Sequence, residues 1–264
     1  MKVFVESAAI LAPGLTGWAA GRAVLAGEKT YEPAPLAFLV ADLLPAVERR
    51  RTGSMVKLAL AVGHAALTCA DRPVDSVATV FASSGGDGDV INDICITLAG
   101  EDRQLSPTRF HNSVHNAPSG YWGIATHSHH PSTSLCACDW SFAIGLLEAA
   151  AQLQVDRREL LLVAYDTPYP LPLGGVRPLA EPFGAALLLT RDRSNRSIAE
   201  LEITLDAQAQ EISRMSDAAL EHLRTGNPCA RALPLLAALA GAQRQSVTLE
   251  RSAGQTLSIS VRTV

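Results

Sequence analysis

The hydrophobic residues of the chain are grouped into short continuous runs and into longer segments with a different spacing. The runs have the length and the Val, Leu, Ile and Phe content of buried strands; they cover residues 2–11, 76–84, 158–165 and 183–189. After Asp139 the apolar positions instead recur every three or four residues, as on one side of a helix. Residues 54–69 are rich in Ala and Leu and predict a buried helix with Ser54 at its N-cap, and a further helix is expected over residues 89–98. The alternation of strands and helices predicts an α/β fold whose sheet is covered by helices on both faces.

The connections are predicted from their polar, Gly and Pro content. Residues 106–131 are polar and rich in His and Gly, and we interpret their His-rich part at 127–130 as a solvated loop. A short strand over residues 132–137 and a sharp turn then precede the helix beyond Asp139, while Pro and Gly residues between 168 and 178 predict a stiff surface loop between two strands. The remaining chain predicts a strand at 197–205, helices at 216–224 and 229–241, and a hairpin made by residues 246–250 and 256–261.

Composition limits the classes of partner. The 264 residues are 48% hydrophobic and 18% charged, which is typical of a globular protein with a real core. Lys and Arg number 22 against 26 Asp and Glu, a net charge of −4, so a basic surface for nucleic acid is not expected. The N-terminus lacks the apolar block of a secretory signal, and no run approaches the roughly 18 apolar residues of a membrane span. We therefore expect a cytoplasmic protein without membrane insertion, whose five cysteines are reduced thiols.

Several short motifs fail the spacing that their chemistry requires. Residues 27–30 (GEKT) lack the glycines that wrap a phosphate. The His-rich stretch at 127–130, with His111 and His115 nearby, contains no spaced Cys/His pair, HExxH pattern or carboxylate. Cys136 and Cys138 lack the two-residue spacer of redox and zinc pairs, and there is no Gly-x-Ser-x-Gly elbow. We accordingly expect neither a metal nor a cofactor.

The stretch from His111 to Ala149 contains the most specific pattern in the chain. It consists of residues 111–124 (HNSVHNAPSGYWGI), 131–139 (PSTSLCACD) and 142–149 (FAIGLLEA). In this order they resemble the N-terminal half of the β-ketoacyl synthases, where an interface helix with a small-residue face precedes a strand, a nucleophile elbow and a buried helix with an Ile-Gly pair. The resemblance extends to the helix at 54–69, to Gly85-Gly86 and to residues 183–186. It implies one thiolase-like half with a mixed, mostly parallel sheet over residues 1–190, and a short α+β extension over 191–264 packed on the same domain.

The chain departs from this family at the centre of the elbow. Counting back from Ile144-Gly145 places the family's nucleophilic cysteine at position 137, where this chain has Ala137 between Cys136 and Cys138. The family also takes active-site histidines from a second, C-terminal half, and the 75 residues after Leu189 are too few to form one. Residues 63–66 (GHAA) are similar to one histidine motif but lie in the predicted core helix. The activated thiolate and the polarising groups that condensation needs are therefore missing.

What remains resembles a chain length factor of the aryl polyene type, a non-catalytic subunit of fatty acid or polyketide-type biosynthesis. The resemblance implies that the chain pairs with a full-length ketosynthase, that it shapes the acyl tunnel of the heterodimer, and that an acyl carrier protein reaches the complex. Residues 110–123 would pack across the interface, with the elbow near the tunnel. The expected interface or tunnel residues are Phe110, His115, Asn116, Gly120, Tyr121, Trp122 and Asp139.

Two alternatives remain open. The chain is a truncated condensing enzyme or an acyltransferase if Cys136 or Cys138 acts as the nucleophile, its thiolate favoured by the N-terminus of the following helix. It is a folded homodimeric scaffold if neither acyl chemistry nor a ketosynthase partner is involved. For the chain length factor interpretation no catalytic residue is expected at Cys136, Ala137 or Cys138.

Overall fold

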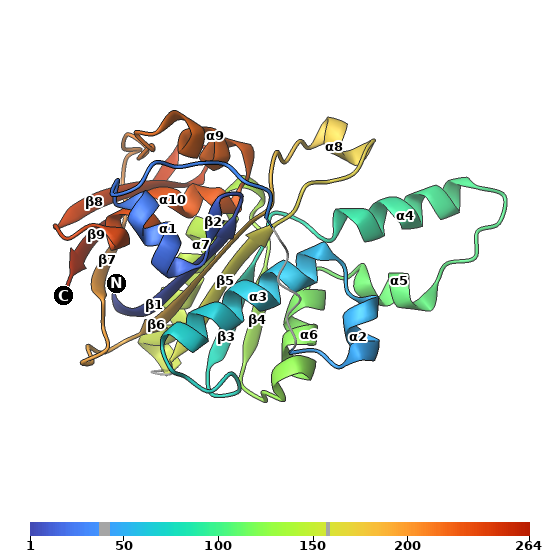
Figure 1. Ribbon diagram of the computed structural model, residues 1–264, viewed down its shortest axis with the longest axis horizontal. Helices are drawn as coiled ribbons and strands as arrows, with labels where there is room; N and C mark the ends of the chain where they lie inside the picture. Colours follow the sequence, from blue (N-terminus) through green and yellow to red (C-terminus); the bar gives the residue numbers. More distant parts are fainter. Residues whose placement is uncertain (37–42, 157–158) are drawn as a thin grey trace.

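The computed structural model describes residues 1–36, 43–156 and 159–264 of the chain. Its strands form one mixed sheet in the order β4-β3-β5-β6-β1-β7-β9-β8, with β2 beside β1 (Figure 1). The strands are β1 (Lys2–Ala12), β2 (Leu15–Thr16), β3 (Ala78–Ala82), β4 (Ser132–Leu135), β5 (Leu160–Asp166), β6 (Phe183–Thr190), β7 (Ala199–Leu205), β8 (Gln245–Ser252) and β9 (Gln255–Thr263). Each predicted strand is present, although Arg158, where the third was expected to begin, lies outside the described residues.

The helices lie on both sides of this sheet, as predicted. They are α1 (Trp18–Leu25), α2 (Ala46–Arg51), α3 (Ser54–Cys69), α4 (Gly88–Ala99), α5 (Pro107–Asn112), α6 (Ala117–Thr126), α7 (Ser141–Asp156), α8 (Leu173–Val176), α9 (Ala218–Gly226) and α10 (Leu233–Ala240), with 3-10 turns η1 (Cys138–Trp140) and η2 (Cys229–Ala232). Neither α3 nor any other helix within the described residues has the length and apolar character needed to cross a bilayer.

The sheet separates two hydrophobic clusters because side chains alternate along each strand. On β5, Leu160, Leu162 and Ala164 face the cluster under α7, α10 and η2, whereas Leu161, Val163 and Tyr165 face the cluster under α3 and α6. The α/β class with helices on both faces is thus confirmed.

The direction of the strands differs from the prediction. Only β3 with β4 and β3 with β5 are parallel, while β5–β6, β6–β1, β1–β7, β7–β9 and β9–β8 are antiparallel. The expectation of a mostly parallel sheet is therefore wrong. Parallel neighbours require a crossover, usually a full helix; the connection from β5 to β6 contains only the four-residue α8, so the chain turns back and β6 runs antiparallel to β5.

One local prediction also needs correction. Ser54 is the first residue of α3 and not its N-cap, which is Gly53. Residues 106–131 contain the helices α5 and α6. The Ser106 hydroxyl caps α5, and a proline occupies the first turn of each helix, where its missing N–H costs no hydrogen bond.

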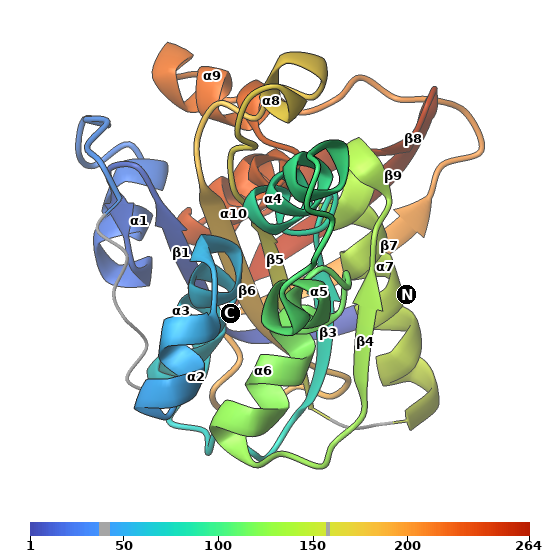
Figure 2. The ribbon, with the colours of Figure 1, turned by 90° about the vertical axis from the view of Figure 1, so that its right-hand side faces the viewer.

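The C-terminal residues extend the same sheet. β7 pairs with the start of β1, with Ala199 opposite Val5, and the β8–β9 hairpin follows it at the sheet edge. η2 and β8 contact α7, so this part of the chain covers the helix behind the elbow. At the other side of the molecule α4 and α5 project away from the sheet (Figure 1), and α4, α5, α6 and β4 together face the viewer in Figure 2.

Candidate functional site

The elbow lies between the end of β4 and the start of α7 and is fixed by a buried serine. Ser141 Oγ accepts the N–H of Ala137 at 3.0 Å and lies 2.8 Å from the carbonyl oxygen of Cys138 and 3.0 Å from that of Ser83. Ser141 has no exposed surface. Cys138 has φ of +49°, a left-handed conformation that is uncommon outside glycine. The predicted strand, sharp turn and helix are confirmed, and the turn is held in one conformation.

The helix behind the elbow approaches the sheet closely. A Cβ atom placed on Gly145 of α7 would lie 2.8 Å from Cβ of Ala82 on β3 and 3.1 Å from the side chain of Leu162 on β5. Ordinary contacts between carbon atoms are about 3.5–4.0 Å. The Ile144-Gly145 pair therefore marks a point where only glycine allows α7 to pack against the strands.

The chemistry available at the elbow is limited to the two flanking thiols. Position 137 presents a methyl group, which cannot form a thioester. Cys136 and Cys138 are free and exposed, and Cys136 Sγ donates to the carbonyl oxygen of Ser84 at 3.2 Å. No group of His, Cys, Asp and Glu suited to a metal ion occurs within residues 1–36, 43–156 and 159–264.

A buried carboxyl group supports the loop that faces Cys136. Asp166, at the end of β5, is 1% exposed. Its Oδ1 accepts the Ser84 N–H and hydroxyl, each at 2.9 Å, and the Ser83 hydroxyl at 3.0 Å. Burial raises the pKa of Asp166, and the pKa of the Cys229 thiol beside it is raised mainly by burial and further by this carboxyl group. The cluster is enclosed, so it positions the loop after β3 rather than meeting a substrate.

Tyr169 packs against the glycine-containing turn that follows β3. Its ring fills the space above Gly85 and Gly88, where any Cβ atom would collide with it. Burial raises the pKa of Tyr169. Beside it lies a mainly apolar cavity of about 260 Å³, lined by Gly86, Gly88, Ile91, Tyr169, Leu173, Val176 and Arg177. The glycines of the turn after β3 thus leave room for the ring of Tyr169, which comes from the Pro-rich loop.

Asp139 ties the elbow to two distant segments of the chain. Its carboxylate accepts Arg177 Nη2 at 2.8 Å and Arg231 Nη2 at 3.0 Å, and Arg231 Nη1 also donates to Glu250 at 3.2 Å. Arg177 follows α8 and Arg231 lies in η2. We had expected Asp139 at an interface or tunnel; in the structure its carboxylate is engaged in ion pairs within the chain.

The projecting region from α4 to α6 carries several exposed apolar side chains. Phe110 is 63% exposed, Ile96 60%, Val114 49% and Ile124 44%. An ion pair between Arg109 and Asp93 links α5 to α4. We call the surface made by the exposed side chains of α4, α5 and α6 the helical face. Asn116 and Gly120 are exposed on it, and β4, which forms one edge of the sheet, lies beside it (Figure 2).

Two of the residues predicted for the interface or tunnel are buried in the core of the isolated chain. Tyr121 is 3% exposed and Trp122 2%, and both lie in the hydrophobic cluster under α3. The Tyr121 hydroxyl donates to Asn112 Oδ1 at 2.9 Å, and Asn112 Nδ2 donates to the carbonyl oxygen of Arg51 at 2.7 Å. These side chains anchor α6 and α5.

His115, also predicted for the tunnel, is half-buried between α5 and α6. Its Nε2 is enclosed without a hydrogen-bond partner among the described residues. Buried polar atoms are usually paired, so an unpaired one requires an explanation.

The residues that connect the elbow to its surroundings were not predicted from the sequence. Tyr169, Asp166, Arg177 and Arg231 follow no local pattern, since each acts across a large separation in the chain. One missed feature did have a sequence signal: Asp87 caps α4, its side chain accepting the N–H of Val90, and Asp directly before a helical segment is a common N-cap.

Comparisons with known proteins agree with this geometry. Residues 18–253 match the family model described as "Beta-ketoacyl synthase, N-terminal domain". A comparison with curated proteins gives no match.

The chain also resembles solved structures over its whole length. A structure of a ketosynthase (ApeO) in complex with its chain length factor (ApeC) from Xenorhabdus doucetiae matches with 23% identity and a TM-score of 0.74, covering 99% of each chain. The ishigamide ketosynthase/chain length factor matches with 14% identity and a TM-score of 0.74, covering 100% of this chain and 99% of the other. A β-ketoacyl synthase from Burkholderia phymatum STM815 matches with 12% identity and a TM-score of 0.69, again over 100% and 99%. At these identities the likeness supports the fold.

Proposed function

Because the chain belongs to the family of the β-ketoacyl synthase N-terminal domain, we propose that it is a non-catalytic chain length factor that pairs with a full-length ketosynthase. The observation that carries the proposal is Ala137. The family's elbow is present, with Ser141 holding its turn, but the position of the nucleophile has only a methyl group. We infer that a chain with this elbow helps to form the acyl tunnel of the heterodimer but does not form the acyl-enzyme intermediate.

The partner surface is the helical face together with β4. Phe110, Val114 and Ile124 give this region exposed apolar side chains, which a partner protein would cover. β4 is an edge strand whose outer side is unpaired within the described part of the sheet, and such edges are ready to associate with another chain. Two of the similar solved structures are described as a ketosynthase with a chain length factor, which supports the same partner class.

The acyl chain would pass close to His115. This residue lies between α5 and α6, directly after exposed Val114, and carries the Nε2 that is unpaired among the described residues. An acyl carrier protein would deliver the chain to the ketosynthase of the pair; one similar structure is described as an acyl-carrier protein in complex with its ketosynthase, with 12% identity and a TM-score of 0.78. The proposed cellular location is cytoplasmic.

The test is co-expression with a full-length ketosynthase of the aryl polyene type. The proposal predicts a stable complex of one copy of each chain on size-exclusion chromatography. Failure of the two chains to co-purify would exclude the chain length role. An isolated Ala137→Cys variant should still be inactive in condensation, because a thiol alone does not polarise the thioester or assist decarboxylation.

The acyltransferase alternative uses the exposed thiols of Cys136 and Cys138. Labelling by iodoacetamide at neutral pH separates the two proposals. Rapid and selective modification of either thiol, compared with exposed Cys69 and Cys95 as internal references, would support a reactive nucleophile. Equal rates at all four exposed thiols would support the non-catalytic proposal.

A further inference from the structure

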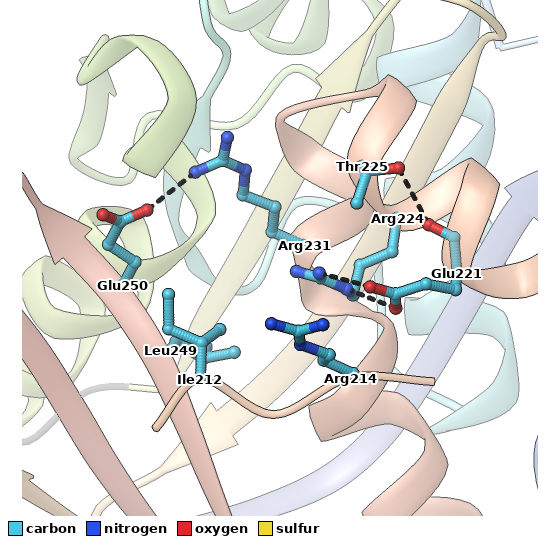
Figure 3. Close-up of a pocket in the computed structure, with 8 residues that line it drawn as sticks. All are labelled: Ile212, Arg214, Glu221, Arg224, Thr225, Arg231, Leu249 and Glu250. Carbon is cyan, nitrogen blue, oxygen red and sulfur yellow. Dashed lines mark hydrogen bonds and ion pairs between the residues drawn. The ribbon is translucent and has the colours of Figure 1, made fainter. Parts of the chain in front are cut away.

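The C-terminal part of the chain encloses a second cavity, distant in sequence from the helical face. It has a volume of about 330 Å³ and lies between α9, η2, β8 and the segment before α9 (Figure 3). The residues that line it are Ile212, Arg214, Glu221, Arg224, Thr225, Arg231, Leu249 and Glu250. Three guanidinium groups thus reach one small space, accompanied by two carboxylates and two apolar side chains.

Two of these arginines already have carboxylate partners. Arg224 Nε and Nη2 donate to Glu221 Oε2 and Oε1 at 2.7 and 2.6 Å, and the N–H of Met215 adds a bond of 2.9 Å to the same carboxylate. These contacts, led by Arg224, lower the pKa of Glu221 to about 2, so it is ionised at neutral pH. Arg231 is shared between Glu250 and Asp139.

Arg214 has no such partner. Within the described residues it makes no hydrogen bond or ion pair, although it lies close enough to Glu221 to help lower that pKa. Arg177 also binds Asp139, so the arginines Arg177, Arg214, Arg224 and Arg231 share three carboxylates, those of Asp139, Glu221 and Glu250. One positive charge remains uncompensated, and it belongs to a side chain that faces the cavity (Figure 3).

The remaining lining is apolar. Leu249 is 3% exposed and Ile212 is half-buried, and in Figure 3 their side chains lie on the same side of the cavity as Arg214. Guanidinium groups bind carboxylates through paired hydrogen bonds, and ligand pockets combine apolar walls with a few polar groups in volumes from about 300 Å³ upward. We propose that this cavity binds a small amphipathic carboxylate, with its carboxylate on Arg214 and its hydrocarbon body against Ile212 and Leu249.

A ligand in this cavity would be connected to the elbow through one side chain. Arg231 lines the cavity and also holds Asp139, three residues from Cys136. The elements that line the cavity lie on the side of the molecule away from α4 and α5 (Figure 1). Its occupancy can therefore be measured on the isolated chain.

The experiment is isothermal titration calorimetry of the full chain with hexanoate. Binding is expected at roughly millimolar Kd, in keeping with the few heavy atoms of the ligand. Hexanamide, which has the same hydrocarbon body without the charge, should not bind. Arg214→Gln should raise the Kd for hexanoate about tenfold or more, the factor expected for a hydrogen bond to a charged group. Because Arg214 is exposed and unpaired, this variant should keep the wild-type Tm.

Arg103→Gln is the matched control, since Arg103 is an exposed arginine outside the cavity, and it should bind hexanoate like the wild type. Inorganic phosphate in the same titration distinguishes an organic acid from a bare oxyanion. The proposal is overturned if hexanoate fails to bind at tens of millimolar, if Arg214→Gln binds it as well as Arg103→Gln does, or if phosphate binds as tightly as hexanoate.

Discussion

Phe110 offers the strongest single test of the proposed interface. It lies on α5, the middle helix in sequence of the three that form the helical face, and is 63% exposed in the isolated chain. An aromatic side chain presents about 200 Å², so with 63% of it exposed a partner can cover roughly 125 Å². At about 25 cal/mol per Å² this burial contributes roughly 3 kcal/mol. Because alanine retains Cβ, Phe110→Ala should weaken binding by about 2–3 kcal/mol, a rise in Kd of roughly 30- to 150-fold.

The assay is biolayer interferometry of each variant against the immobilised ketosynthase. Val155→Ala is the matched control, because Val155 is 79% exposed at the end of α7 and lies away from the helical face. Both variants should keep the wild-type Tm, since neither side chain belongs to a hydrophobic cluster of the chain. Equal affinities of Phe110→Ala and Val155→Ala for the ketosynthase would refute the placement of the interface.

Three stability predictions follow from the packing and the charges. Gly145→Ala should lower the free energy of unfolding by about 1 kcal/mol, because a methyl group 2.8 Å from Ala82 Cβ costs more than the gain in helix propensity returns; unchanged urea stability would contradict this. Arg224 holds the pKa of Glu221 at about 2 instead of 4.5, so Glu221→Gln should destabilise the protein above pH 4.5. The difference in urea midpoint between this variant and the wild type should shrink toward pH 2. A difference that does not change with pH would count against the ion pair as its cause. Burial raises the pKa of Asp166, so the free energy of unfolding of the wild type falls as pH rises. The free energy of unfolding of Asp166→Asn, relative to that of the wild type, should therefore be higher at pH 8 than at pH 4. The opposite trend would be inconsistent with the raised pKa.

Much of the fold follows from local patterns. The β5 and β6 runs are apolar on both sides because both faces of the sheet are covered, and the β8–β9 hairpin turns at Ala253-Gly254, where Gly254 has a positive φ. The helix over residues 54–69 has the predicted bounds. These elements depend on nearby residues, so the sequence contains the information needed to place them.

Strand direction and the helices of the projecting region depend on more distant contacts. The order of β6, β1 and β7 brings together residues as far apart as Val5 and Ala199, which no local period reveals. α5 and α6 have weak hydrophobic periodicity, and they are fixed by Asn112, which bonds to Tyr121 and to the backbone of Arg51.

The elbow could be predicted only in part. The spacing from Ile144-Gly145 located Ala137, but the ion pairs of Asp139 join residues separated by 38 and 92 positions. The arginine-lined cavity likewise gathers residues from 212 to 250. Sites of this kind are assembled by the topology of the C-terminal strands, so they become visible only when those strands are placed.

The most direct measurement of the central proposal is the condensation rate of the reconstituted pair. The full-length ketosynthase is assayed with its acyl carrier protein, alone, with the wild-type chain, and with a Cys136→Ser/Cys138→Ser variant, in which the serine at 136 can still donate to the carbonyl oxygen of Ser84. We predict that condensation requires this chain and proceeds at the same rate with the variant. Loss of condensation with the variant, or condensation by this chain in the absence of the ketosynthase, would contradict a non-catalytic role.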